Sequence, residues 1–198
     1  MVNPVSYATS ASLNNPVLTG TKYCLMVVLG VAVITASAKT TVPFWPVPMT
    51  LQTMAIMAIA VATGPRIAVA TMLAYLAVGA AGLPVFAGTP ERGIGIAYMM
   101  GPTGGYLAGY LIAAGFVGAL ARGRGAFGRF AVMMAGMVPV YLLGLAGLSG
   151  FVASEKVVAL GFTPFILGDT IKIALVAFGG AAITRLTKRK PSNRADAA

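Results

Sequence analysis

The sequence predicts an all-α integral membrane protein with six transmembrane helices and long outer loops. Of its 198 residues, 58% are hydrophobic and 9% are charged, whereas a soluble domain carries about 25% charged residues. The mean hydropathy of +0.88 agrees with this difference. Apolar runs close to the ~20 residues that cross a bilayer recur along the chain, and they lack the alternation of a membrane β-barrel. Lipid is therefore expected to surround the folded chain.

Prolines, glycine clusters and charges separate these apolar runs into six segments. The second and third segments are short for a membrane crossing, so tilted helices are expected there. Residues 1–198 are expected to form a single membrane-embedded domain. The predicted spans are residues 23–38, 49–63, 67–82, 103–120, 130–151 and 165–186.

The basic residues predict how the chain is oriented in the membrane. With six spans and both termini inside, ten of the 14 lysines and arginines fall on the inner side and four on the outer side. Short cytoplasmic loops collect such residues, so both termini are predicted to be cytoplasmic. Residues 187–198 are expected to form a basic cytoplasmic tail that lies against anionic lipid head groups.

The chain lacks the residues that several functions require. It contains no histidine, one cysteine (Cys24) and four scattered acids, so we expect neither a zinc or iron site nor a Ser-His-Asp arrangement. We assign no catalytic residue and no metal ligand, and an enzyme acting on lipid would be poorly equipped. The net charge of +10 is attributed to cytoplasmic loops and not to nucleic-acid binding.

Asp169 and Lys172 are the most informative residues of the chain. They lie three residues apart at the start of an apolar span, so their side chains face the same way on a helix. Ionisable groups inside a span are costly and mark functional sites. Two interpretations stay open: a pair that binds a ligand, or a mutual ion pair at the outer interface.

Small residues recur at helical spacing in two places. Gly101, Gly105 and Gly109 repeat every four residues at the start of the fourth span, a spacing that permits close packing of helices. Ala32 and Ala36 on the first span have the same separation. This pair allows another helix to dock closely, although the pattern is common in membrane proteins.

Other polar and aromatic residues are candidates for a pocket that opens outward. The proline-rich stretch 41–49 is predicted to be an extended loop, whose Trp45 either lies in the interface or covers a site. Arg92, the one outer arginine, either clamps an anionic group or is solvated. Gln52 and Tyr75 either join helices by hydrogen bonds or line the same pocket as Asp169.

Three stretches together resemble the BioY family, which comprises the biotin-specific substrate-binding (S) components of energy-coupling factor (ECF) transporters. They follow the family order and cover about residues 42–178. The first is 46–88, which begins PVPMTLQT and ends GLPVFAG; the others are GPTGGYLAGYLIAA and FILGDTIKIALVA.

The resemblance implies a six-helix protein in the cytoplasmic membrane of a prokaryote, which captures biotin from outside with high affinity. It also implies a transmembrane coupling protein and two ATP-binding cassette ATPases as partners, and no cofactor besides the transported biotin. The family motif places Asp169 and Lys172 at the ligand and Ala32 and Ala36 against the coupling protein. The residues expected to bind substrate are Asp169, Lys172, Arg92, Trp45, Gln52, Tyr75, Gly105 and Tyr106.

Two alternative functions stay open at this point. One is an S component for another small vitamin, such as thiamine or riboflavin. The other is a self-contained facilitator that acts as a homo-oligomer without an ATPase. The chain has no nucleotide-binding P-loop, which fits a subunit that relies on partner ATPases.

Overall fold

The computed structural model describes residues 16–43 and 49–180, and this part of the chain is mostly helical. A short antiparallel hairpin follows the first helix and pairs Thr41 with Thr50. The elements are α1 (Pro16–Lys39), β1 (Thr41–Val42), β2 (Met49–Thr50), α2 (Gln52–Thr63), α3 (Pro65–Ala80), α4 (Gly95–Met99), α5 (Gly104–Leu120), α6 (Ala126–Leu148), α7 (Ser154–Gly161), α8 (Thr163–Ala174) and a π-helical turn, η1 (Leu175–Gly179).

Among the described residues, three helical stretches are long and apolar enough to cross a membrane: Gly20–Lys39, Ala126–Leu148 and Ser154–Gly179. Helices α2, α3 and α5 are also apolar but shorter. Each predicted span overlaps one of these helices.

The structure corrects one predicted boundary and adds one helix that was not predicted. The second span was expected to start at Met49, but Met49 and Thr50 pair in the hairpin, and the helix starts only at Gln52. Before the sixth span the structure has the separate helix α7, which ends where Pro164 enters the first turn of α8. Because proline lacks a backbone N–H, it fits the first turn of a helix. The segments predicted to be outer loops therefore contain secondary structure of their own.

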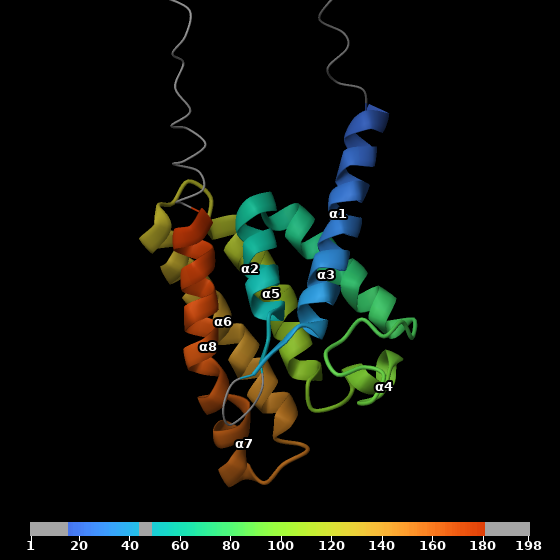
Figure 1. The fold of residues 1–198 in the computed structure, drawn as a ribbon, viewed down its shortest axis with the longest axis vertical. Coiled ribbons are helices and arrows are strands. Elements are labelled where there is room, and N and C mark those ends of the chain that lie inside the picture. The colour runs from blue at the N-terminus through green and yellow to red at the C-terminus, as the bar shows by residue number, and fades with distance from the viewer. Residues whose placement is uncertain (1–15, 44–48, 181–198) are drawn as a thin grey trace, which may run out of the picture.

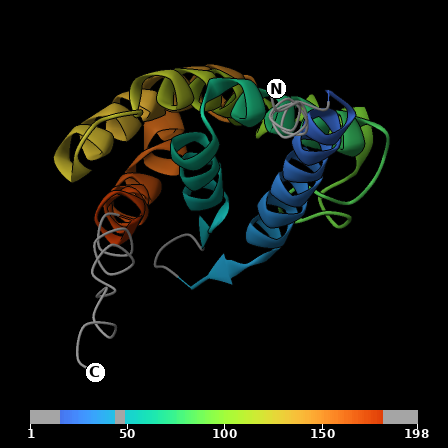
Figure 2. The same cartoon turned by 90° about the horizontal axis from the view of Figure 1, so that it is seen from above.

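The helices form a curved layer, and further helices pack on its concave side (Figures 1 and 2). Helix α5 lies between α6 and α3 in the layer, and α1, α2 and α8 lie on the inner side, with α2 against α5. The buried core follows these contacts and includes Met57, Tyr75, Val117 and Met133.

Small residues allow the helices to approach closely. Gly64 joins α2 to α3 with a φ of 81°, a left-handed conformation that favours glycine. A Cβ added to Gly118 of α5 would lie 2.7 Å from the Pro65 nitrogen, so this turn packs directly on α5. Gly30 of α1 likewise contacts the Thr71 side chain, because an added Cβ would lie 2.6 Å from its methyl group.

The two ends of the bundle differ in charge. The start of α1, the α2–α3 turn and the α5–α6 loop lie at one end, and the hairpin, α4 and α7 lie at the other (Figure 1). We call the first the basic end. It carries Lys22, Arg66, Arg122, Arg124 and Arg129, whereas the opposite end carries Lys39, Arg92, Lys156, Glu91 and Glu155.

Candidate substrate-binding site

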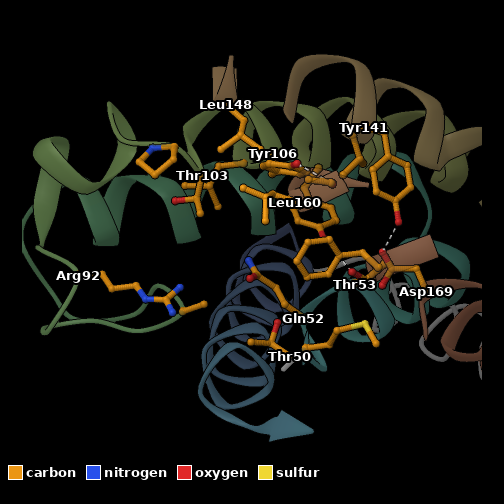
Figure 3. Close-up of a pocket in the computed structure, with 18 of the residues that line it drawn as sticks. Thr50, Gln52, Thr53, Arg92, Thr103, Tyr106, Tyr141, Leu148, Leu160 and Asp169 are labelled. Carbon is orange, nitrogen blue, oxygen red and sulfur yellow. Dashed lines mark hydrogen bonds between the residues drawn. The ribbon is translucent and has the colours of Figure 1, made fainter. Parts of the chain in front are cut away.

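A cavity of about 300 Å³ opens at the end opposite the basic end. Small-molecule sites in proteins occupy about 300–1,000 Å³, so the cavity suits a small ligand. Its walls come from β2, α2, the segment before α4, and helices α4 to α8. Segments from most of the chain therefore meet around it (Figure 3).

A buried network of charged and polar groups forms one side of the cavity. The Lys172 amino group lies 3.1 Å from Oδ1 of Asp169, one helical turn away. The Tyr141 hydroxyl donates to Oδ2 of Asp169 at 2.7 Å. Asp169 and Lys172 are only 5% and 7% exposed, so their pair is an interior feature and not a solvated interfacial one.

The ammonium group of Lys172 has one further neighbour from a distant part of the chain. It lies 3.9 Å from the sulfur of Met49 on the hairpin. Gly168 makes this approach possible, because a Cβ there would collide with the Met49 side chain. The hairpin therefore packs against the second half of α8.

Arg92 lies on the opposite side of the cavity from Asp169, as Figure 3 shows. Its segment turns at Gly88, which has a φ of 71°. A Cβ at Gly88 would lie 2.7 Å from Cδ of Arg92, so glycine is required both by the backbone and by the side chain that crosses it. Within the described residues, no carboxylate pairs with the Arg92 guanidinium.

Two hydrogen-bonded pairs of side chains lie between these two sides of the cavity. Gln52 donates its amide N–H to the Tyr75 hydroxyl at 3.4 Å, and Tyr75 donates to the Val85 carbonyl at 3.1 Å. Thr53 and Tyr110 share a hydroxyl–hydroxyl bond of 2.7 Å. Gln52 and Thr53 are both buried at the start of α2, so they present polar atoms from a fixed helix end.

Aromatic and apolar residues supply the remaining wall. Tyr106 packs on Gly144 of α6 and donates to the Gly161 carbonyl at 2.7 Å. The ring of Tyr141 packs edge-on against Phe162, with ring centroids 4.8 Å apart. The aromatic residues that line the cavity are Tyr98, Tyr106, Tyr110, Tyr141 and Phe165.

Comparison with known proteins agrees with this architecture. The model of the BioY family matches residues 8–189. A protein of Pyrococcus horikoshii named a probable biotin transporter BioY is 38% identical over 75% of this chain and 88% of its own length. A biotin transporter BioY of Thermotoga maritima is 34% identical over 78% of this chain and 91% of its own.

The chain belongs to the BioY family. A solved structure described as the S-component for biotin from an ECF-type ABC transporter has a TM-score of 0.71 and 26% sequence identity to this chain. The match covers 90% of this chain and 96% of that chain. The resemblance inferred from three sequence stretches is thus confirmed, and the chain is a membrane protein with a transporter fold.

Within this BioY fold, most but not all of the expected site residues line the cavity. Asp169, Lys172, Arg92, Gln52 and Tyr106 do so. They come from four separate parts of the sequence, which the fold brings together around one cavity.

Three expected residues lie elsewhere. Tyr75 is fully buried and lies behind Gln52 without lining the cavity. Gly105 does not line it either, because Gly105 faces α6, where a Cβ would collide with the Leu143 carbonyl oxygen. Trp45 falls in residues 44–48, outside the described part of the chain.

Sequence reasoning missed Tyr141 and the role of Met49. Tyr141 is 28 residues from its partner Asp169, and no local spacing connects them. The available signal was a tyrosine inside an otherwise apolar span, since a buried phenol needs a hydrogen-bond partner. Met49 had no polar signal at all, because its contribution depends on how the hairpin folds back.

Proposed function

We propose that this chain is the substrate-capture subunit of an ECF-type importer and binds biotin from the outer side of the membrane. Membership of the BioY family, whose named members are transporters, makes it a transport protein and not an enzyme. The observation that carries the proposal is one cavity with a buried Asp169–Lys172 pair on one side and Arg92 on the other.

The Asp169 side of the cavity suits a ureido ring. Biotin's ring offers two N–H donors and one carbonyl acceptor. An ionised carboxylate has about four acceptor positions, and Tyr141 and Lys172 use one oxygen each. Asp169 therefore keeps acceptor capacity for ureido N–H groups, and Lys172 can donate to the carbonyl.

The Arg92 side suits the carboxylate at the other end of the ligand. Lys172 is already paired with Asp169, whereas the Arg92 guanidinium has no acidic partner among the described residues. Arginine binds carboxylates with two parallel hydrogen bonds. Gln52 and the tyrosines between the two sides provide polar and aromatic contacts for the middle of the ligand.

Direct binding to the purified chain in detergent tests the ligand. Addition of biotin is expected to raise the thermal stability of the chain, since a ligand that binds only the folded state stabilises it. Thiamine and riboflavin at the same concentration are expected to leave it unchanged. Protection by one of those vitamins, without protection by biotin, would contradict the assignment.

We further propose that six segments cross the cytoplasmic membrane of a prokaryote, with both termini inside. The charge difference between the two ends supports this orientation. In a Cys24→Ser background, Gly123→Cys in the α5–α6 loop should be labelled only from inside, and Lys156→Cys on α7 only from outside. Labelling of Gly123→Cys from outside would reverse the topology.

The proposed partners are a transmembrane coupling protein and two ATP-binding cassette ATPases. Ala32 and Ala36 are both exposed on α1, beside Leu29 and Val33 on the same outward surface. They lie away from the cavity lining. A coupling helix could therefore approach α1 closely without disturbing the site.

Ala32→Leu tests this docking surface. It should leave biotin binding unchanged but lower assembly with the coupling protein and ATP-driven uptake, because the leucine holds the helices apart. Ala131 and Ala135 repeat the spacing on the exposed side of α6, so Ala135→Leu is the matched control. Equal loss from both variants would contradict docking through α1, and full uptake without the ATPases would favour a self-contained facilitator.

A further inference from the structure

A lysine at the end of α1 holds the segment that carries Arg92. Lys39 is the last residue of α1, and its amino group donates to the Thr89 hydroxyl at 2.7 Å and to the Thr89 carbonyl. These two residues are 50 positions apart in the chain. The contact is made to neutral oxygens and not to an acid, so it is a directed hydrogen bond and not a surface ion pair.

Thr89 is the last residue of a short turn, residues 85–89, that several hydrogen bonds hold in place. It is only 5% exposed, and its hydroxyl also donates to the Phe86 carbonyl at 2.7 Å. Phe86 is fully buried and stacks on Tyr98. Tyr98 in turn donates to the Ala87 carbonyl at 2.8 Å. The turn at residues 85–89 is therefore packed against the core on its inner side.

The same turn also fixes the position of the Arg92 backbone, from which the side chain extends. The Arg92 backbone N–H donates to the Gly88 carbonyl at 2.9 Å, and the Arg92 side chain crosses Gly88 closely. A shift of Gly88 or Thr89 would therefore move the Arg92 backbone and, with it, the guanidinium group. Lys39 itself does not line the cavity, so its influence on a ligand passes through this turn.

We propose that Lys39 is a positioning residue, which places Arg92 against the anionic end of the ligand by holding Thr89. This inference rests on the proposed function of the cavity. It assigns a role in ligand selectivity to a residue at the end of α1 that does not line the cavity and lies 50 positions from Thr89 in the chain.

The test compares biotin with an uncharged biotin amide, in which the carboxylate has been replaced. Lys39→Met should weaken biotin binding by about fivefold, the size of effect expected when one charge-assisted hydrogen bond is misplaced. Binding of the amide should stay within about twofold of the wild type. Lys156→Met removes the same charge from exposed α7 at the same end of the molecule and should change neither affinity.

A double-mutant cycle separates positioning from simple electrostatic attraction. In an Arg92→Gln background, Lys39→Met should cause no further loss, since its effect acts through Arg92. An equal loss in both backgrounds, or an equal loss for both ligands, would overturn the proposal.

Two conservative variants guard against a general folding defect. Lys39→Arg keeps a cationic donor and should restore most of the biotin affinity. Thr89→Val changes no charge but removes the hydroxyl, which accepts from Lys39 and donates to the Phe86 carbonyl. It should reproduce the selective loss to a smaller extent, because the Thr89 carbonyl still accepts from Lys39. A Thr89→Val variant with unchanged selectivity would count against the proposal.

The outcomes also distinguish this inference from the proposed function itself. A wild-type chain that fails to bind biotin rejects the proposed function. A chain that binds biotin but tolerates Arg92→Gln without loss keeps that function and rejects the role of Lys39.

Discussion

The two sides of the cavity are built in different ways. The Asp169 side combines residues one turn apart on α8 with a tyrosine from α6, so regular helices set its geometry. The Arg92 side belongs to an irregular segment that is held by side chains from α1, α3 and α4. The first side is thus centred on a pair that one helix brings together locally, whereas the second is positioned by contacts between distant parts of the chain.

This difference has an energetic consequence. On the Asp169 side two buried charges neutralise each other, and removal of either leaves the other without its partner. On the Arg92 side a single cation faces the cavity, and its loss leaves no buried charge behind. Substitutions on the first side should therefore cost more affinity than those on the second.

Asp169→Asn should have the largest effect on ligand affinity. It replaces a charged acceptor by an amide and leaves Lys172 buried without its anion, a change that costs about 2–5 kcal/mol in such pairs. Biotin affinity is expected to fall by about a hundredfold, measured by isothermal titration in detergent. Glu155→Gln, an exposed acid on α7, is the control and should have no effect. Retention of affinity within about twofold would remove Asp169 from the site.

Lys172→Met should have the second-largest effect, with a loss of biotin affinity of about thirtyfold. The loss is smaller because Tyr141 still donates to the remaining carboxylate. If Lys172 meets the ureido end, biotin and its uncharged amide should lose affinity equally. A loss confined to biotin would show that the carboxylate lies at the Asp169 side, and the assignment of the two sides would be reversed.

The same contrast explains what the sequence could predict. The helical segments and the placement of Asp169 and Lys172 on one face of a helix followed from apolar length and from the i, i+3 spacing. Arg92 was a candidate because it is the one arginine predicted on the outer side. The contact of Lys39 with Thr89, which holds the Arg92 segment, could not be predicted, because 50 residues separate Lys39 from Thr89. Gly105 was misplaced because a glycine-rich helix start has the same spacing whether it faces a ligand or a neighbouring helix.

Arg92→Gln tests the contribution of the Arg92 side of the cavity to ligand affinity. It should weaken biotin binding by about tenfold, because one bidentate charge-assisted contact is lost. The uncharged amide should bind as it does to the wild type, since no buried charge is left unpaired. Arg124→Gln, an exposed arginine at the basic end, is the matched control. Equal loss for both ligands would mean that Arg92 supports the fold of its segment and does not contact the carboxylate.

Tyr141→Phe should have the smallest effect, about threefold, because it removes one hydrogen bond to Asp169 while the ring and its contact with Phe162 are kept. Tyr23→Phe serves as the control, since the Tyr23 hydroxyl bonds the Arg66 carbonyl at the basic end.

The loss from Tyr141→Phe should vanish in an Asp169→Asn background, because the hydroxyl acts on the ligand through the carboxylate that it orients. It should also be equal for biotin and for the amide, as expected of the ureido side. A loss that persists without the Asp169 carboxylate would show that the Tyr141 hydroxyl contacts the ligand itself. The Asp169 side would then present two independent polar contacts, where the present geometry has one carboxylate held by its neighbours.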